Sequence, residues 1–306
     1  ANITVAGTTT ANFAIVPVGS AGRISVYMPV GGDLVLDLAG WFTTAGVDAG
    51  TGTATAGRLV PLSVPEHWRT MTATAGTTPL LYRPSSSTVP SGASVAALVV
   101  AVSASKATAD GYVRLFPAGA AASAFTHSNL NFVRGRPATN LAIVPVGTNR
   151  RISMYVYGNR RDSVVLDVDV VGWITSATAA PSVEGTFVPL SPFRLLDSRT
   201  TTAFAAAELR TLVASQGGVP ANAAAVSLNA TVTGTAAAGL LQVRPGARPA
   251  QIVRTVTFAA AQTVAAGSIT GVTRRASSAT LNVFLSRAGH AIIDVTGYFT
   301  GPAPIT

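Results

Sequence analysis

The 306-residue chain combines 48% hydrophobic residues with only 11% charged residues and contains no cysteine. With a mean hydropathy of +0.43, it is too apolar to be disordered, and its length allows a sizeable core. The lack of cysteine excludes a disulfide framework and a thiolate metal site, while 3 histidines and 12 carboxylates leave few groups for acid–base chemistry. We therefore expect a folded protein that is not an enzyme and that has no cofactor or metal.

The net charge of +9 comes almost entirely from arginine, since Lys106 is the only lysine. Nucleic-acid-binding proteins normally concentrate basic residues beside stacking aromatic rings, whereas these arginines are scattered and aromatic residues make up 7% of the chain. We expect no nucleic-acid partner, although the positive field favours weak attraction to a polymer such as a cell-wall polysaccharide. The longest apolar run, residues 95–102, is far shorter than the stretch of about 20 residues that crosses a bilayer, so we expect no transmembrane segment.

From the N-terminus onward, the chain repeats itself. Residues 12–19 (NFAIVPVG) recur as residues 140–147 (NLAIVPVG). A second motif occurs three times and consists of an aspartate followed, four residues later, by an aromatic residue that comes directly after a glycine. The aspartates and aromatic residues of this motif are Asp37, Asp169, Asp294, Trp41, Trp173 and Tyr298.

The front part of the repeated unit occurs only twice. Residues 59–63 match residues 187–191, and residues 111–117 match residues 239–245. We therefore predict tandem modules, one of which is incomplete at the N-terminus. The predicted boundaries are the C-terminal half of a module at 1–42, a linker at 43–57, a complete module at 58–175, a linker at 176–186, a complete module at 187–300 and a tail at 301–306.

Within the modules, apolar and polar residues alternate with period two, as in residues 151–157 (RISMYVY). β-Branched and aromatic residues fill the apolar positions, and Gly, Pro, Asn or Asp separate one short run from the next. This pattern is typical of an antiparallel β-sandwich or β-barrel. We predict an all-β fold built from antiparallel β-sandwiches of the jelly-roll or immunoglobulin-like kind. The best helix candidate is residues 203–215, where alanine is abundant, although Thr211 and Val213 also suit a strand.

The three repeated aspartates have two interpretations. They would serve as ligands for a metal ion or a sugar hydroxyl, or they would accept structural hydrogen bonds from a neighbouring strand or an arginine. We favour the structural interpretation, because calcium requires several oxygen ligands and no second acid repeats beside the three. The aromatic residue that follows each aspartate would either stack on a sugar or close the core, and the adjacent glycine favours the core.

Three further motifs do not indicate a shared catalytic site. Arg194, Asp197 and Arg199 suit a small ion-paired cluster, but the first complete module has no equivalent. Ser103 and Lys106 match a Ser-x-x-Lys pattern, yet they lie at the end of a predicted strand and do not open a helix. Lys106 also suggests an intramolecular amide with an asparagine. The three histidines occupy non-equivalent positions and define neither a zinc site nor a catalytic triad.

Several of the repeated sequences together resemble a known kind of module. They are VPLSPFRLLDSR (188–199), SNLNF (128–132), IVPVG (143–147) and DVTGYF (294–299). This order is similar to that of modules repeated in secreted and cell-wall-associated proteins of actinobacteria. The resemblance covers nearly the whole chain and implies an extracellular, cell-surface location with no catalytic residues to assign. The last module departs from it, since RTVTF (254–258) replaces SNLNF.

Two functions fit these observations. The first is a structural protein whose modules form a cell-surface stalk or a self-assembling fibre, as a homo-oligomer joined through exposed strand edges. The second is a carbohydrate-binding array that mediates adhesion to cell-wall polysaccharide. Its candidate contact residues are Tyr82, Tyr112, Tyr155 and Tyr157. We favour the first function because the half-module leaves strand edges without partners.

Overall fold

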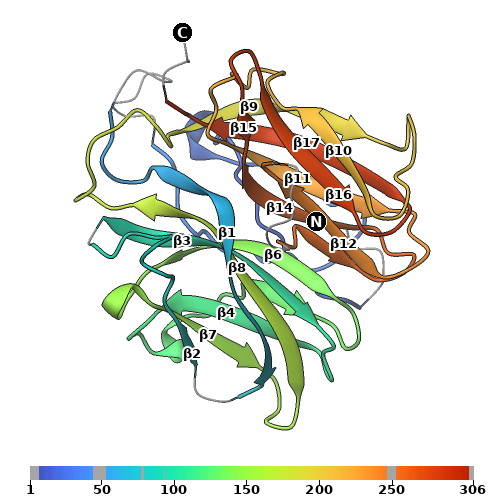
Figure 1. Cartoon of the computed structure of the whole chain (residues 1–306). Coiled ribbons are helices and arrows are strands. Elements are labelled where there is room, and N and C mark those ends of the chain that lie inside the picture. Colours follow the sequence, from blue (N-terminus) through green and yellow to red (C-terminus); the bar gives the residue numbers. More distant parts are fainter. Residues whose placement is uncertain (1–6, 44–52, 77–78, 93, 247–252, 303–306) are drawn as a thin grey trace.

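The computed structural model describes residues 7–43, 53–76, 79–92, 94–246 and 253–302. Its strands form two β-sandwiches, each built from two antiparallel sheets (Figure 1). This confirms the predicted all-β class and the antiparallel sandwich architecture. The alternation of apolar and polar residues explains these strands, because successive side chains of a strand point to opposite faces of its sheet.

The first sandwich occupies residues 59–175. Its strands are β1 (Leu59–Thr74), β2 (Leu80–Tyr82), β3 (Val95–Ser105), β4 (Gly111–Pro117), β5 (Leu130–Phe132), β6 (Ala138–Pro145), β7 (Ile152–Tyr157) and β8 (Ser163–Thr175). One sheet has the order β1-β8-β3-β6, and the facing sheet has the order β2-β7-β4-β5. Two short 3-10 turns, η2 (Ala122–Ala124) and η3 (Thr148–Arg150), lie in its loops.

The second sandwich occupies residues 187–299. Its strands are β9 (Phe187–Asp197), β10 (Glu208–Val213), β11 (Ala225–Thr233), β12 (Gly239–Arg244), β13 (Val256–Phe258), β14 (Val264–Gly271), β15 (Thr273–Arg274), β16 (Ala279–Leu285) and β17 (His290–Phe299). One sheet has the order β14-β11-β17-β9, and the other has the order β10-β16-β12-β13, with β15 paired to β16. The helix considered for residues 203–215 is wrong, since β10 pairs with β16 along its whole length.

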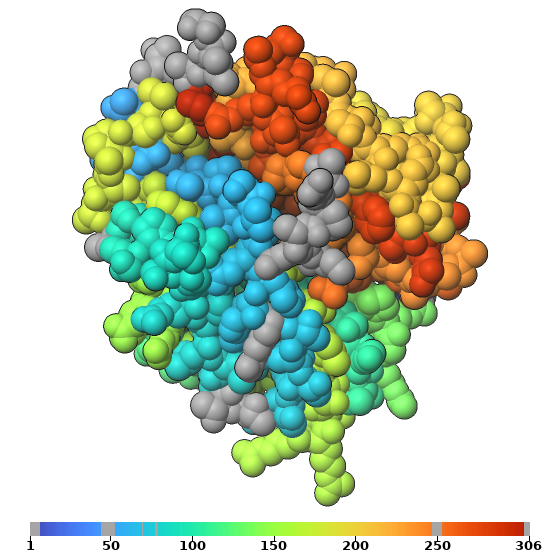
Figure 2. Space-filling view, viewed as in Figure 1, coloured from blue at the N-terminus to red at the C-terminus, as the bar shows by residue number. Residues whose placement is uncertain are grey.

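The strand orders of the two sandwiches correspond one to one. β9, β17, β11 and β14 take the places of β1, β8, β3 and β6, while β10, β16, β12 and β13 take the places of β2, β7, β4 and β5. Each sandwich has its own apolar core between its sheets. The space-filling view shows the two sandwiches in direct contact (Figure 2).

Strand β3 illustrates how the two sandwiches share apolar surface. Leu98, Val100 and Val102 point into the core of the first sandwich, whereas Val99 and Ala101 belong to the cluster between the two sandwiches. Both faces of this strand are therefore buried, which explains why the sequence of residues 95–102 is almost continuously apolar.

Residues 7–43 differ from both sandwiches, because the only regular element that they form is the 3-10 turn η1 (Ser20–Gly22). Between residues 7 and 42, the strands that we expected in this half-module are not formed. The segment, blue in Figure 1, runs beside the junction of the two sandwiches. Among the described residues, no helix has the length and apolar character needed to span a membrane.

The predicted linkers approach each other. Ala54 and Ser182 form an isolated antiparallel bridge, and the Arg58 guanidinium donates a hydrogen bond to the Glu184 carbonyl. Parts of the predicted first linker and of the tail, residues 44–52 and 303–306, lie outside the described residues.

Candidate functional site

The junction between the two sandwiches contains a third apolar cluster that also receives side chains from the N-terminal segment. Leu59, Leu141 and Val99 come from the first sandwich, and Phe299 and Ile269 come from the second. Phe13 and Ile15 of the N-terminal segment pack against this cluster. Three separate parts of the chain therefore meet at one place.

Two asparagine side chains fix the N-terminal segment to both sandwiches. The Phe13 amide donates to Asn140 Oδ1 at 2.9 Å, and the Gly267 amide donates to Asn12 Oδ1 at 2.6 Å. Asn12 also lies 3.4 Å from Asn229, measured between Nδ2 and Oδ1. Asn12 and Asn140 are the first residues of the repeated sequence. Repetition marks these asparagines in the sequence, but their residue type alone does not predict that they are contact residues.

Gly267 permits the close approach of the N-terminal segment to β14. A Cβ atom at this position would lie 1.9 Å from the Phe13 carbonyl oxygen, far inside the van der Waals distance. Any other residue at position 267 would therefore push the segment away from the strand. The requirement for glycine comes from this tertiary contact and has no counterpart in the local sequence.

Beyond this anchor, the N-terminal segment leaves its apolar side chains in solvent. Val16, Leu38 and Trp41 are 51%, 84% and 78% exposed. Their counterparts in the first sandwich, Val144, Val170 and Trp173, are 1%, 0% and 8% exposed. Soluble proteins rarely expose so many large apolar side chains along one stretch of chain, so this segment is a candidate interaction site.

The repeated aspartates of the two sandwiches have basic partners in the same place. Asp169 of β8 lies opposite His67 of β1, with Oδ1 and Nδ1 2.6 Å apart. Asp294 of β17 lies opposite Arg194 of β9, which donates from Nε to Oδ1 at 2.6 Å. In each case the partner stands on the first strand of the sandwich. Asp37 is exposed, and the described residues form no strand around it.

Asp169 is the more buried of these carboxyl groups, with 1% of the residue exposed. Burial raises its pKa, and the hydrogen bond to His67 opposes that rise.

Polar side chains also join the two sandwiches directly. Asp167 of the first sandwich forms an ion pair with Arg254 of the second at 3.1 Å, and Thr139 and Thr257 are joined by a hydrogen bond of 2.8 Å. Polar contacts therefore accompany the apolar junction.

The aromatic residues of the repeated motif also pack into the cores of the two sandwiches but are exposed in the N-terminal segment. Trp173 belongs to the core of the first sandwich, and Tyr298 packs against the core of the second. Burial raises the pKa of Tyr298. Trp41, by contrast, is largely exposed.

All four candidate sugar-binding tyrosines come from strands of the sheet β2-β7-β4-β5. Three of them, Tyr112, Tyr155 and Tyr157, lie on one face of this sheet, which we call the tyrosine face. Tyr112 and Tyr157 face each other across β4 and β7, and their rings stack with centroids 4.6 Å apart and planes 6° apart. Tyr155 stands opposite Arg114 in the same pair of strands. The Arg114 guanidinium lies 5.4 Å from the centre of the Tyr112 ring and donates to the His127 carbonyl.

Tyr82 does not belong to this tyrosine face. It is 2% exposed, its ring lies 4.5 Å from Trp68 between centroids, and its hydroxyl donates to Glu66 at 2.9 Å. Burial is the main cause of its raised pKa. A buried ring offers no face to a sugar, so the structure removes Tyr82 from the candidate contact residues.

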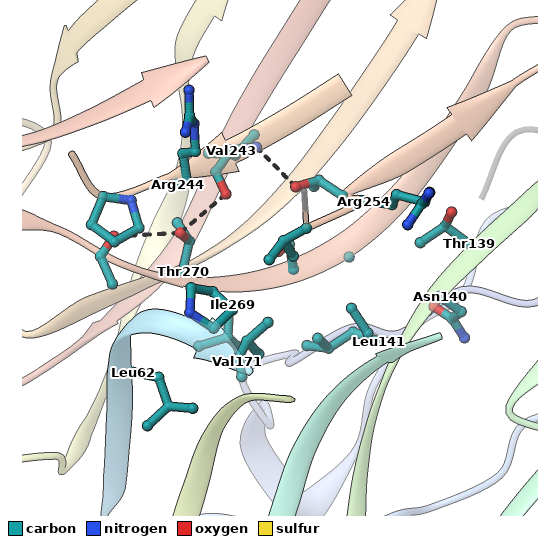
Figure 3. A pocket seen from close by; sticks show the side chains of 18 residues that line it. Leu62, Thr139, Asn140, Leu141, Val171, Val243, Arg244, Arg254, Ile269 and Thr270 are labelled. Carbon is teal, nitrogen blue, oxygen red and sulfur yellow. Dashed lines mark hydrogen bonds between the residues drawn. The ribbon is translucent and has the colours of Figure 1, made fainter. Parts of the chain in front are cut away.

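A small cavity lies in the junction (Figure 3). Its lining includes Leu62, Asn140, Val171, Arg254 and Ile269, and its volume is about 20 Å³. This space holds about one water molecule, so it is far too small for a sugar.

The remaining polar motifs are dispersed. Arg194 and Arg199 both pair with Asp197, at 2.8 and 2.7 Å, which confirms the expected ion-paired cluster. These hydrogen bonds hold the pKa of Asp197 well below its usual range. Lys106 is exposed after β3 with a φ of 51°. The described residues contain no group of three or more His, Asp or Glu side chains that could hold a metal ion.

No protein-family model, no curated protein and no solved structure matches this chain.

Proposed function

We propose that this chain is a non-catalytic structural protein, a building block of an extracellular stalk or fibre at the cell surface. The N-terminal segment, residues 7–43, joins it to a neighbouring polypeptide by pairing strands. The observation that carries this proposal is the contrast between the segment and its paired copies: the same apolar positions are buried in the sandwiches and exposed in the segment.

Two physical arguments support this function. Unpaired backbone groups and exposed apolar side chains in one stretch form a template for another chain, and strand addition satisfies both at once. In addition, the repeated aspartates at 169 and 294 are engaged by basic side chains inside their own sheets. These two repeated aspartates thus have structural partners and do not converge on one pocket.

Light scattering and negative-stain electron microscopy of the purified chain test the proposal. We expect concentration-dependent association that requires the N-terminal segment, because burial of its apolar residues is favourable. Leu38→Lys should abolish this association. Tyr157→Lys places the same charge at an exposed position of the first sandwich, outside the N-terminal segment, and should leave the association intact. A chain that stays monomeric at every concentration while residues 12–42 are protected from hydrogen exchange would contradict the proposal.

The tyrosine face supports a second candidate function, binding of a cell-wall polysaccharide. Tyr157 is 54% exposed, and its stacked partner Tyr112 receives a hydrogen bond from Arg114 at 3.2 Å. A fixed aromatic surface beside a polar group suits the apolar face and the hydroxyl groups of a sugar ring. The corresponding positions of the second sandwich, Leu240 and Ser286, are not aromatic.

Retention on purified peptidoglycan and wall polysaccharide tests this second function. Tyr157→Ala should reduce retention at least about tenfold if the ring supplies 1.4 kcal/mol or more of binding free energy. Tyr27→Ala is the matched control, since Tyr27 is also exposed, at 86%, but lies in the N-terminal segment. Equal retention of the two variants would remove the tyrosine face from consideration.

A further inference from the structure

The pairing of strands shows what the N-terminal segment lacks. In the first sandwich, β6 pairs with β3, β7 pairs with β2 and β4, and β8 pairs with β1 and β3. The strands of the back half, β6–β8, therefore pair only with strands of the front half, β1–β5. The second sandwich follows the same rule for β14, β16 and β17, apart from the two-residue pairing of β15 with β16.

Residues 7–43 correspond to a back half alone. Residues 12–19 match part of β6 and the residues that follow it, residues 23–27 match part of β7, and residues 34–42 match β8 in sequence. Since back-half strands do not pair with one another, this segment cannot form a sheet by itself. The absence of strands in its described residues follows directly from the strand order of the fold.

Strand register shows that Gly267 is the residue equivalent to Phe13 and Leu141. In the first sandwich, Ala101 of β3 pairs with Leu141 on one side and with Asp169 on the other. In the second sandwich, Asn229 of β11 pairs with Gly267 on one side and with Asp294 on the other. Phe13, Leu141 and Gly267 are therefore equivalent positions on three edge segments, and the preceding residues Asn12, Asn140 and Ala266 are equivalent as well.

Two hydrogen bonds join these three segments, and they form two of the three links of a closed ring. The Phe13 amide donates to Asn140, and the Gly267 amide donates to Asn12. In both bonds, an amide of one unit meets the equivalent asparagine of the next unit. The third bond of the ring would run from the Leu141 amide to position 266, where the residue is alanine and offers no acceptor.

The apolar junction has the same threefold character. Ile15, Ile143 and Ile269 occupy equivalent positions, two residues after Phe13, Leu141 and Gly267, and all three contribute to the junction. At the other end, the Phe42 ring contacts Phe187 and Phe299, with centroids 4.9 and 6.1 Å apart. Phe299 is itself the equivalent of Phe42, so both ends of the N-terminal segment occupy the place of a third unit.

We infer that residues 7–43 mark the place of a third β-sandwich, related to the two complete sandwiches by a pseudo-threefold axis, and that a polypeptide supplying the equivalents of β1–β5 completes it. This inference rests on the proposed structural function and names the partner. The partner's first strand carries a basic side chain opposite Asp37, as His67 and Arg194 stand opposite Asp169 and Asp294. Charge complementarity and an apolar inner face thus define the partner's chemistry.

A second copy of this chain does not satisfy these requirements. Both of its front halves, β1–β5 and β9–β13, are already paired with back halves. Two copies can cover their N-terminal segments by association, but neither supplies the missing strands. The occupant is therefore a front-half polypeptide other than β1–β5 and β9–β13 of a second copy.

An extended chain tests this inference directly. A copy of residues 58–137 replaces residues 1–9 and joins Thr10, which corresponds to Ala138. We expect the amides of Ala14, Val16 and Val18 to exchange at least about 100-fold more slowly than in the unextended chain, because they enter a cooperative sheet. The control extension carries Val100→Asp and Val102→Asp in the added copy only and should give no protection.

Three outcomes overturn the inference. The first is a soluble, folded extended chain in which residues 12–42 exchange as fast as before. The second is equal protection with the control extension. The third is protection of residues 12–42 in the unextended chain that rises with protein concentration to the level of residues 140–146, which would make a second copy the occupant.

A single substitution in the unextended chain tests the pseudo-threefold arrangement if the extended chain aggregates. Ala266→Asn supplies the missing acceptor of the ring, so the Leu141 amide should exchange at least about tenfold more slowly. Ala265→Asn, one residue away and on the other face of the strand, is the control. Ala266 is buried in the core of the second sandwich, so the exchange of the β11 amides serves as the folding control. An unchanged or faster Leu141 amide in an Ala266→Asn variant that keeps the protection of β11 would overturn the pseudo-threefold arrangement. The light-scattering test of the structural function has a separate readout, since a completed third sandwich does not require any larger assembly.

Discussion

Residues 12–19 and residues 140–147 have almost the same sequence and different structures. In the first sandwich, residues 138–145 form β6 and pair with β3 over eight positions. In the N-terminal segment, the copy forms no strand, and Val16 is 51% exposed where Val144 is 1% exposed. The comparison teaches that strand formation here depends on a partner brought from elsewhere in the chain, since local propensity is the same in both copies.

The largest expected effect comes from shortening one leucine in each copy of the final strand. Leu166 is 0% exposed and Leu34, its equivalent, is 51% exposed. Leu166→Ala should lower the free energy of unfolding by about 2–5 kcal/mol, because it leaves a cavity in the core. Leu34→Ala should change it by less than about 0.5 kcal/mol. Denaturant unfolding of both variants measures the difference, and equal losses would show that the N-terminal segment is packed in solution.

A smaller effect is expected at the contact between the segment and β14. Gly267→Ala places a methyl group where only 1.9 Å separates it from the Phe13 carbonyl oxygen. The segment should be displaced, and the Phe13 amide should exchange about tenfold faster because it loses its bond to Asn140. Gly271→Ala is the matched control on the same strand, since the nearest atoms lie at 3.6 Å. An unchanged Phe13 amide in Gly267→Ala would argue against the anchored geometry.

The smallest effects concern the pH dependence of stability. The folded pKa of Asp169 is raised by burial. Its contribution to the free energy of unfolding is therefore present at low pH and is lost as the pH rises through that pKa. The folded pKa of Asp197 is lowered by Arg199 and Arg194, so its contribution is present above its unfolded pKa of about 3.9 and is lost as the pH falls.

Unfolding free energies measured across an acidic pH series check these signs. Asp169→Asn should remove a decrease in stability with rising pH, and Asp197→Asn should remove a decrease with falling pH. The effect of Asp197→Asn is small because its partners are exposed and solvent screens the pairs. Identical pH profiles for the two variants would contradict the assignment of opposite shifts.

The sequence predicts the strands of the sandwiches well where alternation is strong. The run at 151–157 is β7, and the apolar run at 95–102 lies in β3. The helix predicted for residues 203–215 is wrong. Alanine favours a helix locally, but residues 208–213 form β10 because they pair with β16. Propensity is a weak guide when tertiary pairing opposes it.

The candidate site is only partly visible in the sequence. Repetition locates the aspartates, the aromatic residues and the N-terminal half-module, because copies align residue by residue. Alternation does not reveal which face of a strand is inside, so Tyr82 and Tyr157 look alike although one is buried and the other exposed. The contact of Gly267 with Phe13 depends on segments more than 250 residues apart, and no local pattern predicts it.

Amide hydrogen exchange of the unextended chain, measured at low protein concentration, tests most directly whether the N-terminal segment is an unpaired copy of a sandwich strand. The comparison is between Ala14, Val16 and Val18 in the segment and Ala142, Val144 and Val146 at the equivalent positions. The account predicts that the first set exchanges at least about a thousandfold faster than those amides of the second set that are bonded within the sheet. Equal protection of the two sets in a monomeric chain would contradict it.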